Sequence, residues 1–304
     1  MTSDTTHLRK SEIDAFGAGL LVGFSVLLGF NQALVKLVNE GMAPLFQSGL
    51  RSACAFVPVL LYAMYRKRNL SLRDGSLPLG VINGLLFTGE FGLLFTALDF
   101  TTVARASLFF YMMPVWVALG AHFWIPGERL HRGKVFGLTL AVCGVLCAFA
   151  GDLGAAPPNA WVGDLLALWA GIFWAGIALL SRGSRLAEIS AEQNLLYQLG
   201  VSALLLLAVA PWIEPLWRDP TTLTYIAFSF QALVVVSIGF LVWFWILSIY
   251  PVSNMASFGL LAPIFGIFFG WMVFDDALTP TFLVAIALAG AGIVLVNRTA
   301  QVDA

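Results

Sequence analysis

Long runs of apolar residues, separated by short polar breaks, follow one another along the whole chain. Ten such runs approach the roughly 20 apolar residues that a helix needs to cross a hydrocarbon layer about 30 Å thick. Because lipid offers no hydrogen bonds, each run is expected to satisfy its own backbone as a helix, with Gly and Pro marking the breaks. The pattern therefore predicts an all-α integral membrane protein with ten transmembrane helices. The predicted spans cover residues 16–38, 45–65, 77–98, 102–124, 133–150, 161–182, 193–213, 224–249, 252–274 and 280–297.

The composition agrees with a chain that lies mostly in lipid. Of its 304 residues, 60% are hydrophobic and 11% are charged, whereas about a quarter of the residues in a soluble domain are charged. The predicted loops are too short to hold a soluble domain. The net charge of −1 gives no basis for binding nucleic acid, so the expected partners are a small solute and the lipid bilayer. The sequence is compatible with a monomer and leaves the oligomeric state open.

Lysine and arginine residues are distributed unevenly between the two sets of loops. Twelve of them fall in the terminal segments and in the loops after spans two, four and six, and one, Arg218, falls on the other side. Because basic residues accumulate on the cytoplasmic side of a membrane, this asymmetry predicts that both termini face the cytoplasm. The first run is too long for the core of a signal peptide and follows acidic Glu12 and Asp14, so we expect it to be a retained helix.

Three cysteines, Cys54, Cys143 and Cys147, lie inside apolar runs. Three cysteines cannot form a closed set of disulfides, and their spacing matches no zinc or haem motif. We therefore interpret them as small buried hydrophobic residues and expect neither a metal nor a cofactor.

Two stretches about half the chain apart resemble each other. Residues 97–107 are followed by Pro114 and Gly127-Glu128, while residues 247–257 are followed by Pro263 and Asp275-Asp276. The offset between corresponding residues stays at 148–150, which is close to half of the chain.

This offset predicts an internal duplication of five spans. The first repeat would cover residues 1–150, a linker residues 151–159, and the second repeat residues 160–304. An odd number of spans forces the second copy to enter the membrane inverted, and inverted repeats give a carrier one arrangement open to each side around a site near the midplane. A duplication that serves only packing is the alternative.

Several short motifs in this order resemble the drug/metabolite transporter superfamily, in particular its ten-helix EamA-type members. Each motif is weak alone, and together they cover residues 16–297. They comprise Asn31 and Lys36 in span one, Pro44 and Arg51 in span two, the 97–107 turn with Pro114, Gly127-Glu128-x-Leu130, Gly163-Asp164, and Trp174-Ala175. The chain departs from the pattern at Leu28, often an aromatic residue in the family, and at Asp275-Asp276; it also lacks a second arginine matching Arg51.

The resemblance implies a multi-pass carrier of the bacterial cytoplasmic (inner) membrane. Among the relatives, the combination of motifs is most similar to exporters of amino acids, including aromatic ones. Export rather than import follows from the resemblance alone.

Two charged residues lie deep in the predicted spans, Glu90 in span three and Arg51 in span two. A charge near the bilayer centre is costly, so such residues tend to face a cavity or a partner. Arg51 is a candidate for a structural ion pair with Glu90; alternatively, Glu90 lines the site and binds a proton or a substrate amine. Lys36 and Arg105 lie near helix ends, where we expect their side chains to extend to the interface, with contact to a substrate carboxylate as the alternative.

Other polar and aromatic residues within the spans are candidates for lining a solute cavity. Helix-stabilising hydrogen bonds and lipid contacts are the alternatives. Pro114 and Pro263 are expected to kink spans four and nine at matching positions and to act as hinges. The full set of candidate cavity residues is Asn31, Gln32, Asn83, Glu90, Tyr111, Trp169, Phe173, Gln231 and Trp243.

These features favour a secondary transporter that exports amino acids, preferably aromatic or hydrophobic ones, by alternating access. A carrier for a sugar phosphate, a nucleotide-sugar or a cationic drug is the alternative, and a channel is a further one. Phosphorylated solutes would need several arginines in the cavity, and Arg51 and Arg105 are the candidates present. The spans contain no catalytic Ser/His, paired Asp or His cluster, so no catalytic residues and no enzyme activity are expected.

Overall fold

The computed structural model describes residues 14–124, 130, 132–151, 157–239, 242, 246 and 261–302. Regular secondary structure in these ranges is helical, and one isolated bridge joins Met42 to Trp217. The elements are α1 (Ala15–Asn39), α2 (Pro44–Tyr65), α3 (Leu77–Phe100), α4 (Val103–Phe110), α5 (Met113–Trp124), α6 (Arg132–Gly151), α7 (Ala160–Gly183), η2 (Arg185–Ala187), α8 (Ala191–Ile213), α9 (Thr222–Phe230), η3 (Gln231–Ile238), α12 (Leu261–Phe274) and α13 (Pro280–Val302).

Six helical segments within the described ranges are long and apolar enough to cross a membrane. They are α1, α2, α3, the combined α4–α5 segment, α7 and α8. Shorter apolar helices cover residues 135–148, 222–238, 261–274 and 280–295. The regular structure of the described residues is thus helical, with segments long and apolar enough to span a membrane, while the count of ten crossings and the side of the termini stay predictions.

Several helices begin where the sequence supplies a capping residue. The Asp14 side chain accepts a hydrogen bond from the Gly17 N–H at the start of α1, and Thr102 does the same for the N–H of Arg105 in α4. Pro44 occupies the first turn of α2, where its missing N–H leaves no hydrogen bond unmade. These short-range signals explain why the helix ends agree closely with the predicted breaks.

The predicted fourth span is divided into two helices. α4 ends at Phe110, residues Tyr111 and Met112 form a turn, and α5 begins at Met113. Pro114 has no N–H to donate to the carbonyl four residues earlier and its ring crowds that carbonyl, so the α-helical ladder stops there. The predicted kink at Pro114 is therefore a complete break. Pro263 lies in the first turn of α12, whose described part begins at Leu261, so the predicted kink there is not tested.

The eighth predicted span also departs from a regular α-helix. α9 continues into η3, a π-helical segment of eight residues. The Ser237 hydroxyl donates to the carbonyl of Ala232, five residues earlier, in keeping with the wider π turn. π segments within α-helices occur frequently at functional sites.

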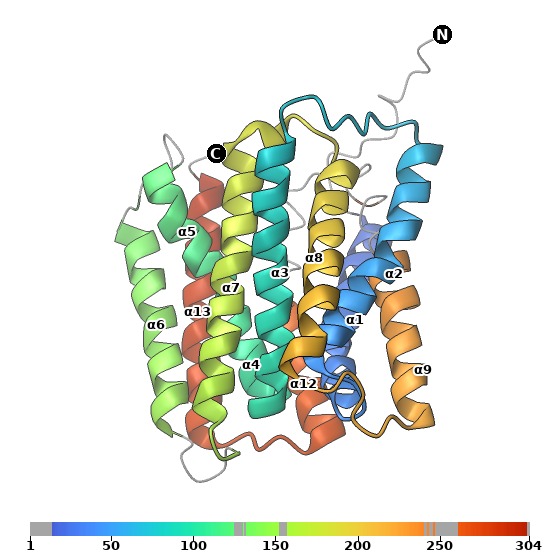
Figure 1. The fold of residues 1–304 in the computed structure, drawn as a ribbon. Helices are drawn as coiled ribbons and strands as arrows, with labels where there is room; N and C mark the ends of the chain where they lie inside the picture. Colours follow the sequence, from blue (N-terminus) through green and yellow to red (C-terminus); the bar gives the residue numbers. More distant parts are fainter. Residues whose placement is uncertain are drawn as a thin grey trace.

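The helices form a bundle in which short connections join neighbours at the two ends (Figure 1). One end contains the turn at residues 40–43 and the break between α3 and α4; we call it the α1–α2 end. The opposite end contains residues 66–76 and η2; we call it the α2–α3 end. The most extensive packing pairs are α6 with α13, α3 with α7, α2 with α8, and α1 with α12.

Candidate functional site

A group of polar side chains lies inside the bundle, surrounded by apolar helices. Gln32 comes from α1, Arg51 from α2, Glu90 from α3, Ser107 from α4, and Tyr111 from the turn after α4. All five are buried, with exposed fractions between 0 and 8%. We call these five residues the central polar group. Glu90 lies ten residues before the end of α3, which corresponds to about 15 Å along the helix axis.

Neutral hydrogen bonds hold one side of the central polar group together. The Ser107 hydroxyl donates to the Gln32 side-chain oxygen over 3.0 Å, and the Tyr111 hydroxyl also interacts with the Gln32 side chain. The Gln32 amide nitrogen is buried and has no partner in the described structure. Gln32 is thus positioned by α4 while one of its donor groups stays unused.

Arg51 and Glu90 occupy the charged side of the group. They are 4% and 3% exposed, and their charges act on each other. They form no direct salt bridge, however, since the Arg51 guanidinium lies over the rings of Phe91 and Phe95, at 4.2 and 4.6 Å from their centroids. The Arg51 Nε is enclosed and unpartnered. Of the two alternatives for this pair, the described structure shows no ion pair; a cation–π arrangement lies beside a carboxylate that has no bonded partner among the described residues.

More unpartnered polar atoms are buried on α1, α2 and η3. Buried side-chain polar atoms are normally hydrogen-bonded, and each one left unsatisfied costs about 1–3 kcal/mol. Gln47 donates to the Gln231 side-chain oxygen over 3.3 Å, and both amides keep a second atom without a partner. Such atoms make this region suited to a polar solute or water. The unpartnered side-chain atoms of these three elements belong to Asn31, Gln32, Asn39, Gln47, Ser48, Arg51 and Gln231.

Aromatic rings line the side of the group that faces α7. The Trp174 ring stacks on Phe110, with centroids 4.9 Å apart and an interplanar angle of 14°, and meets Tyr111 edge-on at 5.8 Å. This arrangement places an aromatic surface next to the polar side chains. In the sequence, Trp174 belongs to the Trp174-Ala175 motif, and nothing in its neighbouring residues distinguishes it from the other tryptophans as a cavity residue.

The structure corrects the place of Trp169. Its side chain is 54% exposed on the outside of the bundle, so it lies away from the central polar group. Trp169 and Trp174 are five residues apart, which at 3.6 residues per turn places them on different faces of α7. Phe173 packs against Gly89, where an added Cβ would come within 2.8 Å of the ring, so it serves the α3–α7 contact. Trp243 lies outside the described residues.

Asn83 belongs to a second polar cluster. Its amide donates to Asn194 over 2.8 Å and to Ser181 over 3.4 Å, and its own oxygen is buried without a partner. Asn83 and Glu90 share a face of α3, because they are seven residues apart, but this separation corresponds to about 10 Å along the helix. The helix therefore carries two separate polar levels, with Asn83 nearer the α2–α3 end.

Arg105 lies inside the protein, which differs from its predicted place at the interface. Its guanidinium forms a bidentate ion pair with the Asp164 carboxylate, with the closest atoms 2.5 Å apart. The Thr101 hydroxyl also donates to Asp164 over 2.7 Å. Arg105 and Asp164 thus fasten the α3–α4 break to α7. Lys36 donates to the Thr101 carbonyl over 2.7 Å, so both basic residues have structural partners.

Asp276, in the segment between α12 and α13, reaches the same region. Its carboxylate accepts a hydrogen bond from the Ala104 N–H at the start of α4, over 2.9 Å. Burial raises the pKa of the Asp276 carboxyl, although this hydrogen bond and the charge of Lys36 act in the opposite direction. Asp276 therefore caps α4 from a segment that is distant in sequence.

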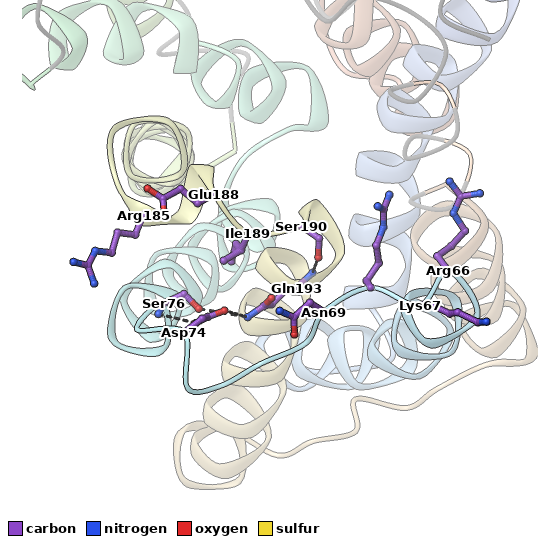
Figure 2. A pocket seen from close by; sticks show the side chains of 11 residues that line it. Arg66, Lys67, Asn69, Asp74, Ser76, Arg185, Glu188, Ile189, Ser190 and Gln193 are labelled. Carbon is purple, nitrogen blue, oxygen red and sulfur yellow. Dashed lines mark hydrogen bonds between the residues drawn. The ribbon is translucent and has the colours of Figure 1, made fainter. Parts of the chain in front are cut away.

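A cavity of about 400 Å³ lies at the α2–α3 end, apart from the central polar group. Four basic residues and two acidic residues contribute to its lining, and Figure 2 shows the Asp74, Ser76 and Gln193 side chains joined by hydrogen bonds. Hydrogen bonds from Ser76 and Gln193 lower the pKa of the exposed Asp74 carboxyl. The charged lining residues are Arg66, Lys67, Arg68, Arg185, Asp74 and Glu188.

Within the described ranges, no three His, Cys, Asp or Glu side chains come together in a way that would hold a metal ion. The chemistry that the site offers is recognition: charged groups, neutral donors and acceptors, and aromatic faces. Nothing in the central polar group resembles an activated nucleophile with its base.

Comparison with known proteins places the chain among transporters. The model of the EamA-like transporter family matches residues 15–150 and again residues 161–298. An uncharacterized transporter of Bacillus subtilis, YoaV, is 25% identical over 275 residues, covering 90% of this chain and 94% of its own. A probable amino-acid metabolite efflux pump of Escherichia coli is 28% identical over 271 residues, covering 84% of this chain and 85% of its own.

A solved crystal structure has the same fold. It superposes with a TM-score of 0.65 at 21% sequence identity, covering 93% of this chain and 98% of the other. At this identity the likeness speaks for the fold alone.

Proposed function

The chain belongs to the EamA-like transporter family, and from this premise we propose that it exports amino acids or related small metabolites across the bacterial cytoplasmic membrane by alternating access. The observation that carries the proposal is the central polar group, with its unpartnered donors and acceptors enclosed in an apolar bundle. Such groups inside a membrane protein are costly for stability alone and mark solute paths.

Alternating access requires two halves that can exchange roles, and the α6–α13 contact supports an inverted repeat. An added Cβ at Gly144 would lie 2.6 Å from the Ala289 nitrogen, and one at Gly292 would lie 2.5 Å from the Ala141 nitrogen. Gly144 and Gly292 are 148 residues apart, as are Ala141 and Ala289. Reciprocal contacts of this kind are typical of a two-fold axis.

The double match of one family model supports the same arrangement. Its two matched stretches begin 146 residues apart and each has room for five helices. With the four shorter apolar helices added to the six long ones, the chain would cross the membrane ten times. Under this proposal both termini face the cytoplasm, and the α2–α3 end with its basic loops is the cytoplasmic end.

The aromatic surface supports a substrate with an apolar or aromatic side chain. The Phe110, Tyr111 and Trp174 rings lie next to the polar side chains, so a ligand with one polar end and one apolar end would match both. The E. coli and Salmonella typhimurium relatives are named probable amino-acid metabolite efflux pumps, which agrees with this class. A phosphorylated substrate would need several free arginines, whereas Arg105 is engaged with Asp164.

Counterflow in proteoliposomes tests this function. Purified protein is reconstituted with a high internal concentration of one unlabelled amino acid, and uptake of the labelled compound is followed. Transient, saturable accumulation that depends on the internal amino acid is expected for a carrier. Uptake that never exceeds equilibration for any of the 20 amino acids would reject the proposal and leave a channel or a carrier for another solute.

A further inference from the structure

Among the buried charged side chains of the described structure, two stand apart from the rest. Six charged residues are buried, and four of them have a bonded partner. Arg105 pairs with Asp164, Glu192 pairs with Arg68, and Asp276 accepts from the Ala104 N–H. The remaining two, Arg51 and Glu90, have opposite charges and no ionic or hydrogen-bonded partner within the described residues.

The failure of Arg51 and Glu90 to pair has a structural cause. Phe91 and Phe95 follow Glu90 on α3 one and five residues later, and their rings hold the Arg51 guanidinium by its face. The Phe87, Phe91 and Phe95 rings contact one another in sequence, at 4.6 and 5.9 Å, which supports this position. A guanidinium held by its face still presents the N–H groups on its edge to a ligand in the plane.

Arg51 and Glu90 carry opposite charges that interact without touching. Each charge therefore offsets only part of the cost of burying the other. Burying a charge without a bonded partner is unfavourable, and more so inside a membrane. A ligand that carries both charges would compensate the two residues together. Gln32 and Tyr111 add neutral hydrogen-bonding groups, and the charge of Glu90 acts on Tyr111.

We propose that Arg51 and Glu90 together bind a zwitterion: the Arg51 guanidinium binds the carboxylate of an α-amino acid and the Glu90 carboxylate binds its ammonium group. This inference rests on the proposed transport function and adds to it the groups that recognise the substrate. The apolar side chain of the substrate lies toward Phe110 and Trp174. Ligands that lack one of the two charges are rejected, because they leave one buried charge of the protein unpaired.

Binding by the purified protein in detergent tests the proposal with three probes of similar shape. L-phenylalanine carries both charges, 3-phenylpropionate only the carboxylate, and 2-phenylethylamine only the ammonium group. The wild-type protein is expected to bind L-phenylalanine at least about tenfold more tightly than either analogue. Glu90→Gln should weaken the binding of L-phenylalanine at least about tenfold and leave the binding of 3-phenylpropionate unchanged. Arg51→Gln should weaken the binding of L-phenylalanine and leave the binding of 2-phenylethylamine unchanged.

Binding is measured by isothermal titration, so that variants that no longer transport stay informative, and thermal unfolding in the same detergent checks that each variant is folded. Glu40→Gln, at an exposed position, is the control and should bind all three probes as the wild type does. If a folded Glu90→Gln or Arg51→Gln protein binds L-phenylalanine within threefold of the wild type, the proposal is overturned. Equal wild-type affinity for the three probes also overturns it, while amino-acid counterflow would still support the transport function.

A variant too unstable to test is replaced by Glu90→Asp or Arg51→Lys, which keep the charge but move it. Each variant should weaken the binding of L-phenylalanine more than the binding of the analogue that lacks the group recognised by the altered residue. An equal loss of affinity for both probes would overturn the proposal. If the wild type shows neither binding nor counterflow of any amino acid, the proposed function fails, and the zwitterion site fails with it.

Discussion

The side-chain hydroxyl groups of Ser52 in α2 and Ser202 in α8 lie 3.2 Å apart in the interior of the bundle. The two residues are 150 positions apart in the chain, which falls within the 148–150 offset between the resembling motifs. A residue that contacts its own counterpart lies on the axis that relates two repeats. The α2–α8 contact therefore supports, independently of the α6–α13 contact, a two-fold relation between the halves.

The glycines of the α6–α13 contact lead to the first prediction. Gly144→Ala and Gly292→Ala each introduce a Cβ within about 2.6 Å of a backbone atom of the facing helix, where neither side can move freely. Each variant should lose about 1–3 kcal/mol of stability from overpacking, and similar losses are expected because the two positions are equivalent. Thermal unfolding in detergent measures the effect.

Gly290→Ala is the matched control on α13, because an added Cβ there meets nothing within 4 Å. It should be neutral or slightly stabilising, since Ala favours a helix more than Gly does. Equal melting temperatures for all three variants would show that α6 and α13 do not pack as closely as described.

The buried ion pair between Arg105 and Asp164 gives a second prediction. Asp164→Asn removes the carboxylate that contacts the Arg105 guanidinium in a site that is 0–7% exposed, so a loss of about 3–5 kcal/mol is expected. Glu214→Gln, which removes one partner of the half-exposed Arg218, should cost less than about 1 kcal/mol.

A double variant tests whether the loss of stability comes from removing only one of the two charges. Arg105→Met with Asp164→Leu removes both charges, so it should be less destabilised than Asp164→Asn alone. Thermal unfolding of the wild type, Asp164→Asn and the double variant gives their order of stability. A double variant that is the least stable of the set would contradict the view that losing the Arg105–Asp164 ionic contact causes the loss of stability.

Asp74 at the α2–α3 end gives a prediction about pH. Hydrogen bonds from Ser76 and Gln193 hold the pKa of its carboxyl below the ordinary value of 3.8. A lowered folded-state pKa adds stability that is present above the unfolded pKa and is lost as pH falls through the folded one. The stability difference between the wild type and Asp74→Asn should therefore shrink as pH falls from 5 to 3. A difference that stays constant over this range would show that the carboxylate charge is not involved.

Much of the helix layout could be predicted from the sequence, because it depends on short-range signals. Predicted spans 45–65 and 77–98 correspond to α2 at Pro44–Tyr65 and α3 at Leu77–Phe100. Apolar length fixes the span, and capping residues and prolines fix its ends. The sequence predicted a kink at Pro114, whereas the structure has a break at Tyr111. The effect of a proline depends on whether neighbouring helices can hold two separate helical segments in place.

The composition of the candidate site was less predictable. Their position inside predicted spans brought Gln32 and Tyr111 into the candidate set, and their side chains interact in the structure. Arg105 was expected near the interface because its position in the span gives no sign of Asp164, which comes 59 residues later. The Arg51–Glu90 relation depends on where two phenylalanine rings hold a guanidinium, and sequence patterns carry no such information.

The two tryptophans of α7 allow the aromatic part of the site to be tested with a control on the same helix. Trp174 stacks on Phe110 beside the central polar group, whereas Trp169 is 54% exposed on the outside of the bundle. Trp174→Ala should weaken transport of phenylalanine about three- to tenfold, as expected from losing an aromatic contact of about 0.5–1.5 kcal/mol. Transport of alanine should change less, because its side chain does not reach the ring.

Trp169→Ala should leave both substrates nearly unaffected, since this side chain faces lipid under the proposed arrangement. The measurement is the concentration dependence of counterflow for phenylalanine and for alanine in each variant. If Trp169→Ala weakens phenylalanine as much as Trp174→Ala does, the effect comes from α7 stability rather than from a ring beside the substrate. If Trp174→Ala weakens the two amino acids equally, the aromatic surface does not contact the substrate side chain.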